Sequence, residues 1–303
     1  MKKFLPIFLL SVFSIVGCES YSQDDYEEVV VIESYAVANR PLPPVRVSKT
    51  VPAEIEYNFS DAAITNAIVQ IVLLDENGDD EYVFPYQIAE GNQRMYIPSP
   101  ESKLHSVLPT RTYRLDVNFN DRDEVIRAYT TVPDQVEIIG NVAQNLVYQS
   151  SEQLEILIAE NERTQTQSVF VFSTVAQEPT IENLTPFYRA SVENGNVELI
   201  DLINNASGLI NEGNFQRNPD GTVTLRFPWI GVAFFGENLV ITSSVDENLD
   251  GLVRSQQLQL GGSTLPPGEI PNLLYNIEGG IGVFGSLSSD TIATRFLRPV
   301  NSQ

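Results

Sequence analysis

Short runs of β-branched and aromatic residues, separated by turn-forming residues, recur through this chain from residue 29 onward. Such runs favour strands, because these side chains pack well on a pleated surface. Asn77-Gly78, a pair typical of a hairpin turn, separates two of them. The runs before residue 135 are residues 29–35, 44–48, 67–74, 82–86, 94–97, 113–119 and 125–132. Seven short strands in about a hundred residues predict an immunoglobulin-like β-sandwich.

Tyr113 stands at the start of a late run, soon after Pro109. In immunoglobulin-like sandwiches a tyrosine in this place bonds through its hydroxyl to upstream backbone, the arrangement called a tyrosine corner. We therefore expect Tyr113 to form one. Val132-Pro133 ends the unit, because proline cannot continue a central strand. The predicted sandwich covers residues 29–134.

The remaining residues, 135–303, are also rich in strand signals but less regular. Strands are predicted over residues 154–158, 168–173, 187–192, 222–227 and 239–245. Residues 247–260 are the best helix candidate, although Gly251 weakens it, and residues 198–209 are left open between helix and other structure. The predicted fold is all-β: an immunoglobulin-like sandwich followed by a second, larger β-rich domain with one or two short helices.

The first residues have the parts of a secretory signal. Lys2 and Lys3 precede 13 apolar residues, and Gly17-Cys18 follows. The apolar stretch is shorter than the roughly 20 residues that a transmembrane helix needs. Residues 15–18 also match the lipobox, the pattern at which diacylglycerol is added to a cysteine before cleavage. We expect residues 1–17 to be a lipoprotein signal peptide and Cys18 to carry the lipid, including palmitate.

Residues 18–28 are polar and acidic and predict a flexible tether between the lipid bilayer and the first domain. Cys18 is the only cysteine, so the mature chain has no disulfide and no cysteine metal site. The chain has 40 acidic and 18 basic residues, for a net charge of −22. Such a surface repels phosphate backbones, so nucleic acid is not an expected partner.

Residues 280–285 spell G-x-G-x-x-G, the dinucleotide-binding pattern. That site needs a following crossover helix and an acidic residue about 20 residues later. No such helix is visible after Gly285, and the sequence ends at Gln303. We interpret the segment as a glycine-rich turn or bulged strand whose backbone passes close to another segment. No cofactor is expected.

Asp246, Asn248 and Asp250, followed by Gly251, match the start of a calcium loop. The twelfth position is Gln257 rather than the bidentate glutamate of the full pattern. The three residues are therefore a weak metal candidate. The alternative is a helix N-terminus with acidic residues at the favourable end of its dipole.

Catalytic patterns are scarce. His105 is the only histidine, which excludes a histidine-based triad and a zinc site with several histidines in one chain. A glycan hydrolase needs only two carboxylates, but the sequence does not single out a pair among 40 acids. Exposed aromatic residues can stack on sugars; for Trp229, Phe234, Phe235 and Phe284 we favour the commoner role in the core.

Several segments resemble one known family. They are residues 29–49, residues 64–69, Tyr113-x-Leu-x-Val117, Thr130-Thr-Val-Pro133 and residues 276–285. Together they resemble the Bacteroidota cell-envelope lipoproteins of the domain-of-unknown-function family 4249. The resemblance implies an outer-membrane lipoprotein, often encoded near TonB-dependent receptors, and no catalytic residues. The acidic residues after Cys18 look like the surface-export signals of such lipoproteins.

The expected function is therefore that of a non-catalytic surface lipoprotein, an accessory of a TonB-dependent outer-membrane uptake receptor. Two alternatives stay open. One is a surface glycan hydrolase with a carboxylate pair, which predicts a cleft with two close carboxylates. The other is a structural spacer, which predicts no exposed aromatic patch.

Overall fold

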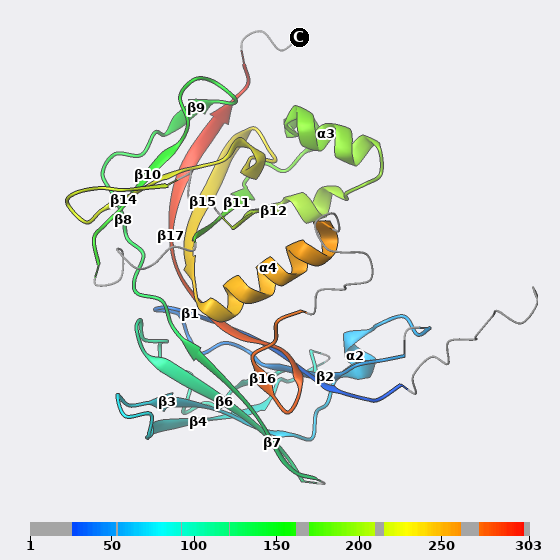
Figure 1. Cartoon of the computed structure of the whole chain (residues 1–303). Helices are drawn as coiled ribbons and strands as arrows, with labels where there is room; N and C mark the ends of the chain where they lie inside the picture. Colours follow the sequence, from blue (N-terminus) through cyan, green and yellow to red (C-terminus); the bar gives the residue numbers. More distant parts are fainter. Residues whose placement is uncertain are drawn as a thin grey trace, which may run out of the picture.

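The computed structural model describes residues 26–52, 54–91, 93–120, 122–161, 170–209, 215–261 and 273–299. Within these ranges the strands form three sheets (Figure 1). The central sheet has the order β12 (Asn204–Leu209), β11 (Phe170–Ala176), β15 (Gly236–Val245), β17 (Ile281–Leu297), β1 (Val30–Val37) and β2 (Arg46–Lys49), and β9 (Asn145–Val147) also pairs with β17.

The other two sheets each cover one half of the central sheet. A six-stranded sheet has the order β16 (Ile277–Glu278), β7 (Arg122–Thr131), β6 (Thr112–Phe119), β3 (Ile68–Leu74), β4 (Asp80–Ile88) and β5 (Tyr96–Pro98). A four-stranded sheet has the order β13 (Phe215–Arg217), β14 (Val223–Arg226), β10 (Glu155–Ile158) and β8 (Ile138–Ile139).

Two sandwiches result, each with its own apolar core. In the first, β1, β2 and the start of β17 pack on the six-stranded sheet, with Ile32, Leu115 and Phe284 in the core. In the second, β11, β15 and the end of β17 pack on the four-stranded sheet, where Phe172 and Phe296 are buried. The all-β prediction, with an N-terminal sandwich and a second β-rich part containing short helices, is confirmed.

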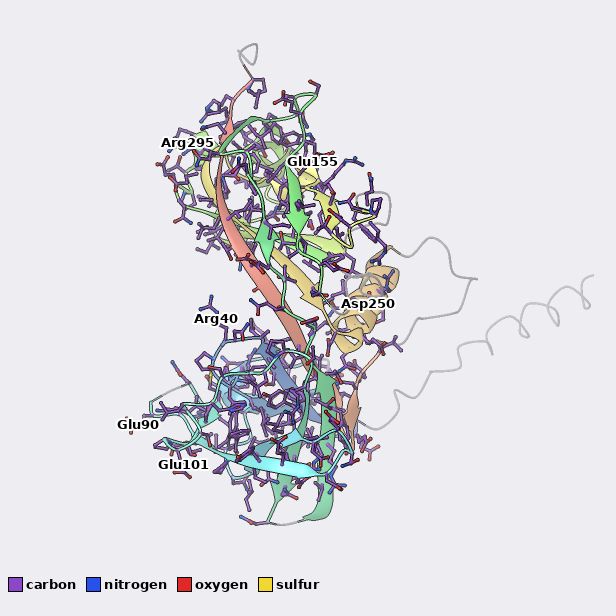
Figure 2. The ribbon with its side chains drawn as sticks, turned by 90° about the vertical axis from the view of Figure 1, so that its left-hand side faces the viewer. Arg40, Glu90, Glu101, Glu155, Asp250 and Arg295 are labelled. Atoms are coloured by element: carbon purple, nitrogen blue, oxygen red, sulfur yellow. The ribbon has the colours of Figure 1, made fainter. Side chains whose placement is uncertain are left out.

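One long strand, β17, belongs to both sandwiches (Figure 1). It pairs in parallel with β1 from Val31↔Ile281 to Val37↔Leu287. From Leu287 onward it pairs antiparallel with β15. The sequence prediction placed a boundary after residue 134, but β16 and the first part of β17 return to the sheets of the N-terminal strands. The chain therefore crosses between the sandwiches three times, the last time along β17, which runs from one sandwich to the other in Figure 2.

The glycines of residues 280–285 allow this parallel pairing. Gly282 has a φ angle of +115°, and a Cβ atom there would collide with the carbonyl oxygen of Ile32. A Cβ atom on Gly280 would lie 2.8 Å from the carbonyl oxygen of Val30. The interpretation as a glycine-rich strand with a close backbone neighbour is confirmed, and the segment continues as a strand to Leu297.

The predicted tyrosine corner is also confirmed. The hydroxyl of Tyr113, at the start of β6, accepts a hydrogen bond from the backbone N–H of Leu108 at 2.9 Å. Its oxygen also lies 2.9 Å from Nε2 of His105. This contact fixes the loop before β6 to the buried start of that strand.

One predicted helix was confirmed, and one predicted strand proved to be a helix. Helix α4 (Glu247–Gly261) forms where it was expected. Residues 187–192, predicted as a strand, instead form most of α3 (Pro186–Glu193). Proline at the first helical position presets φ. Tyr188 and Val192, one helical turn apart, then both pack on a small separate core.

The shorter helical segments are α2 (Phe59–Ala62) and the 3₁₀ turns η1 (Ile181–Asn183), η2 (Leu199–Leu202) and η4 (Trp229–Gly231). Residues 198–209, left open from the sequence, contain η2 followed by β12. Within the described ranges, no helix is long and apolar enough to cross a membrane.

Candidate functional site

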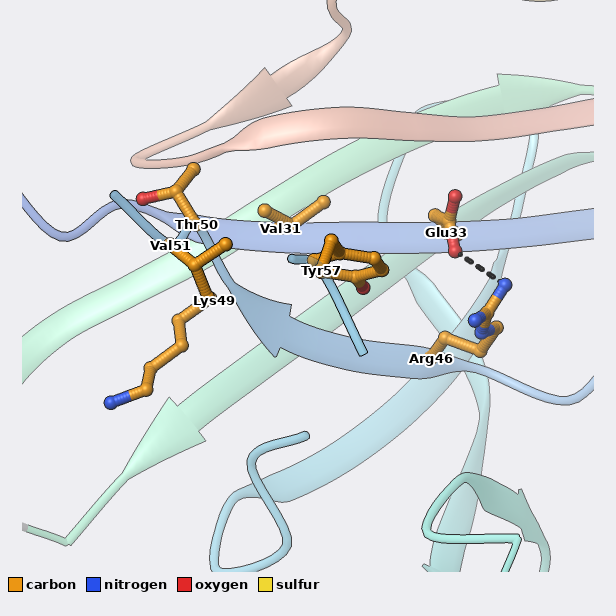
Figure 3. Close-up of a pocket in the computed structure, with 7 residues that line it drawn as sticks. All are labelled: Val31, Glu33, Arg46, Lys49, Thr50, Val51 and Tyr57. Atoms are coloured by element: carbon orange, nitrogen blue, oxygen red, sulfur yellow. Dashed lines mark ion pairs between the residues drawn. The ribbon is translucent and has the colours of Figure 1, made fainter. Parts of the chain in front are cut away.

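An open pocket of about 370 Å³ lies where β1 and β2 form one edge of the central sheet. Figure 3 shows the residues that line it, which come from the two strands and from the segment after β2. They are Val31, Glu33, Arg46, Lys49, Thr50, Val51 and Tyr57. The pocket therefore combines charged, aromatic and aliphatic side chains on a surface of the first sandwich.

Strand alternation places the β1 residues of the pocket. Ile32 and Ser34 are buried toward the core, so Val31, Glu33 and Tyr35 point to the opposite face. The antiparallel register sets Glu33 directly beside Arg46. Their side chains form an ion pair with 2.9 Å between Nη1 and Oε2, as Figure 3 shows.

Arg46 has a second contact that holds its side chain in place. Its guanidinium carbon lies 4.0 Å from the centre of the Phe59 ring in α2, which is a cation–π arrangement. The ion pair with Glu33 compensates its charge, and both side chains keep part of their surface in solvent. The pair can therefore orient a polar ligand without presenting a large net charge.

Two tyrosines flank this ion pair. Tyr57 is 50% exposed, and its hydroxyl oxygen lies 3.4 Å from that of Ser48. Tyr35 is 46% exposed at the next outward position of β1. Partial burial raises the pKa of Tyr35, Glu33 raises it further and Arg46 lowers it. Both rings offer flat apolar surface, and Tyr35 remains a neutral hydroxyl donor at physiological pH, as a binding surface requires.

The first described residues run beside this pocket. The hydroxyl of Tyr26 donates to the carbonyl of Thr50 and lies 3.1 Å from the Thr50 hydroxyl oxygen. Lys49 donates to Glu28 at 2.8 Å, and this bond raises the pKa of Lys49. Residues 26–28, at the end of the predicted tether, are thus fixed to the segment that borders the pocket.

A second open pocket of about 530 Å³ lies beside α3 and the end of β17. Two of its lining residues, Arg189 and Arg298, both donate to the backbone carbonyl of Glu182, at 2.9 and 2.7 Å. Arg298 also lies over the Phe235 ring. These guanidinium groups hold η1 against α3 and the end of β17, so we assign them a structural role.

The calcium candidates Asp246, Asn248 and Asp250 lie at the start of α4. Asp246 is buried, and its Oδ1 accepts from the backbone N–H of Leu249 at 2.9 Å. Its Oδ2 accepts from the Thr130 hydroxyl at 2.6 Å and from the Asn248 amide at 3.1 Å. Burial raises the pKa of Asp246, and the hydrogen bonds from Thr130 and Leu249 oppose the shift.

The side chains of these three residues do not point to one common site. Asp250 turns to Arg254, with 2.6 Å between the charged atoms, whereas Asp246 and Asn248 meet in the helix cap. The geometry matches the helix N-terminus that the sequence left as the alternative. Across the part of the chain that the structure describes, no three His, Cys, Asp or Glu side chains are grouped to hold a metal ion.

The structure also shows where the other residues discussed in the sequence analysis lie. Cys18 lies outside the described residues. Phe234, Phe235 and Phe284 are buried, and Trp229 packs against the core of the second sandwich, which confirms their core role. His105 stacks on Phe84 with 4.3 Å between ring centres, and partial burial lowers its pKa.

Sequence reasoning missed the pocket residues Glu33, Arg46 and Tyr57. The alternation of residues 29–35 could have placed Glu33 and Tyr35 on one face of a strand. It could not show that the strand beside them carries Arg46, because register depends on pairing between distant segments.

Comparisons with solved structures show only weak likeness. The N-terminal four immunoglobulin domains of Dscam1 isoform 6.44 share 10% identity at a TM-score of 0.18; the match covers 92% of this chain and 54% of that one. Three N-terminal domains of the bacteriophage RB49 highly immunogenic outer capsid protein share 8% identity at a TM-score of 0.18, with 89% and 71% covered. This chain thus spans about half of the Dscam1 structure, and such scores support no argument about arrangement or function.

No curated protein matches the chain in sequence. The sequence pattern of one family, described as "Domain of unknown function (DUF4249)", matches residues 19–293. That range contains both sandwiches except for the last residues of β17, together with the pocket beside β1 and β2 and the polar cap of α4. The chain therefore belongs to the DUF4249 family.

Proposed function

We propose that this protein is a lipid-anchored, non-catalytic binding protein at the surface of a Bacteroidota outer membrane, and that it acts as an accessory of a TonB-dependent uptake receptor. The observation that carries the proposal is the pocket beside β1 and β2. It offers a compensated ion pair and the exposed ring of Tyr57 next to the segment where the tether joins the fold, and Tyr35 is exposed at the next outward position of β1.

The position of the pocket suits a partner in the same membrane. Eight peptide units separate Cys18 from Tyr26, and a fully extended chain of that length spans at most about 29 Å. Tyr26 is bonded to Thr50, which lines the pocket. A lipid on Cys18 would therefore keep the pocket within reach of a receptor embedded in that bilayer. Each buried CH₂ of the lipid contributes about 0.8 kcal/mol to anchoring.

The carboxylates support binding over hydrolysis. Asp80 and Asp116 approach each other through Arg114, which bonds to Asp80 at 2.6 Å and to Asp116 at 2.9 Å. The Arg114 hydrogen bond lowers the pKa of Asp80, and the bonds to both carboxylates raise that of Arg114. Arg114 lies between the two carboxylates and pairs with both, so these acids form an ion-pair cluster rather than the open pair around a sugar bond that a glycosidase needs.

The exposed tyrosines also favour binding over a spacer role. A spacer has no need for aromatic rings in solvent, whereas Tyr57 in the pocket and Tyr35 on the same outward face of β1 each expose about half of their surface. Tyrosine is enriched at recognition surfaces because one ring supplies both apolar area and a hydroxyl.

The test is an affinity pull-down of the full lipoprotein from detergent-solubilised envelopes, followed by mass spectrometry. The wild-type lipoprotein should recover a TonB-dependent receptor in an amount nearly equal to its own. Arg46→Ala should reduce recovery about tenfold, as expected for a contact of about 1.4 kcal/mol.

The matched control is Arg226→Ala. It removes an exposed ion pair, to Glu155 at 3.1 Å, from the four-stranded sheet of the other sandwich, and should leave recovery unchanged. Absence of a receptor in the wild-type sample, or equal loss with both variants, would contradict the proposal.

A further inference from the structure

Three exposed side chains with apolar surface belong to the segments at the end of the first sandwich where the tether joins. Tyr26, Ile55 and Tyr57 are 46%, 58% and 50% exposed. We call these three residues the tether-end patch. Ile55 sits on a turn in which its backbone N–H donates to the carbonyl of Pro52 at 3.0 Å. The turn holds an aliphatic side chain outward, where a protein that faced only water would gain nothing from it.

The patch lies at one end of β1, and a different loop lies at the other. Tyr26 bonds to Thr50, which follows β2 and pairs through its backbone with Val29 just before β1 begins. Beyond the last residue of β1, the backbone of Asn39 bonds to that of Val107. Leu104, 93% exposed, belongs to that second loop. The eight residues of β1 separate the two ends.

The chemistry of the patch matches a membrane interface. Tyrosine rings are enriched at the level of lipid headgroups, where an aliphatic neighbour can enter the apolar region. The hydroxyls of Tyr26 and Tyr57 lie against Thr50 and Ser48 of the sandwich, so the exposed parts of both side chains are their rings. Glu28, Glu54 and Glu56 lie around the patch, and only Glu28 is paired in a described contact, with Lys49. The acidic surroundings disfavour anionic lipids, so the matching surface is zwitterionic.

We propose that the tether-end patch rests in the headgroup region of the bilayer that holds the anchor, with Ile55 inserted. This inference rests on the proposed lipid at Cys18, because a tether of at most about 29 Å keeps the patch next to that bilayer. The lipid then supplies attachment and the patch supplies orientation. Glu33 and Arg46, farther along β1 and β2, lie just above the lipid surface, where the rim of an embedded receptor can meet them.

The test uses the full lipoprotein in vesicles of phosphatidylethanolamine and phosphatidylcholine. Lipidation blocks the thiol of Cys18, so a single cysteine introduced by Ile55→Cys can carry an environment-sensitive fluorophore. Leu104→Cys is the matched control, an exposed aliphatic position at the opposite end of β1. Nitroxide-bearing lipids then report which probe lies near the headgroups. Melting curves of both unlabelled variants should match wild type.

The expected result is a blue-shifted emission and at least about half of the fluorescence quenched at position 55, with neither effect at position 104. Replacing the zwitterionic lipids by anionic ones should reduce the quenching at position 55. Equal signals at both positions, in protein that sediments with the vesicles, would overturn the orientation while leaving the anchor intact. Protein that stays in the supernatant would overturn both the anchor and the orientation.

Discussion

The hydroxyl of Thr130 lies 2.6 Å from the carboxylate of Asp246, although 116 residues separate the two in sequence. Thr130 belongs to β7 of the first sandwich, and Asp246 caps α4 directly after β15 of the second. Ser286 of the shared strand β17 completes the contact, with 2.6 Å between its hydroxyl oxygen and that of Thr130. A buried polar junction thus fixes the two sandwiches to each other.

Asp246 makes the stability of this junction depend on pH. Its pKa is raised above the ordinary 3.8, first by burial, so the folded chain binds this proton more tightly than the unfolded chain does. The stabilisation from that proton is full below the unfolded pKa and is lost as pH rises through the folded pKa. Urea unfolding of wild type and Asp246→Asn, from about pH 3.5 to pH 7, should show it.

We expect the free energy of unfolding of wild type, minus that of Asp246→Asn, to fall as pH rises. Thr130→Val removes a hydrogen bond that lowers the pKa of Asp246, so it should move this fall to higher pH. A difference that is constant or grows with pH would show that Asp246 is not proton-linked to folding in this way.

Gly282 tests the close approach between β1 and β17. Gly282→Ala adds a Cβ atom that collides with the backbone of Ile32 at a φ of +115°, and should lower the free energy of unfolding by about 3 kcal/mol or more. Gly78→Ala is the control, because Gly78 also has a positive φ, +85°, but open space around it. It should cost only about 1 kcal/mol. Equal losses would show that the collision is relieved.

Tyr113→Phe tests the tyrosine corner. The variant leaves the N–H of Leu108 without its partner and should lower the free energy of unfolding by about 1–3 kcal/mol. Tyr82→Phe, at an exposed ring of β4, should change it by less than about 0.5 kcal/mol. Denaturant titrations of the two variants give the comparison, and an unchanged midpoint for Tyr113→Phe would contradict the role.

Local signals in the sequence predicted the features that depend on neighbouring residues. The strand predicted over residues 125–132, the corner at Tyr113 and the helix starting at Glu247 each carry a strand, turn or capping pattern within a few residues. The strand prediction for residues 187–192 was wrong because a run of six residues is too short to distinguish a strand period from a helical one. Packing of Tyr188 and Val192 against a core that includes residues from distant segments favoured the helix.

The sequence could not predict which distant strands pair with each other. Two of the strands that pair with β17, β1 and β15, are separated by about two hundred residues, and periodicity contains no information about which strands lie side by side. The pairing of Glu33 with Arg46 and the cap from Thr130 to Asp246 follow from that topology. The candidate pocket could therefore be recognised only in three dimensions.

Adding a chelator or calcium should leave the stability of the fold unchanged. Asp246 and Asn248 are engaged in the cap of α4, and Asp250 is paired with Arg254. We expect the melting temperature to move by no more than about 2 °C when a chelator is added or when millimolar calcium is supplied, since a ligand that binds only the native state would raise it. A larger calcium-dependent rise would restore these residues as a metal site.

The anchor at Cys18 is the central claim, and fractionation combined with mass spectrometry of the mature N-terminus tests it most directly. Wild type should sediment with the outer membrane and begin at an acylated Cys18. Cys18→Ala should remain unprocessed or appear in the soluble fraction. An unmodified Cys18, or a Cys18→Ala protein that is processed and retained on the outer membrane like wild type, would contradict the account.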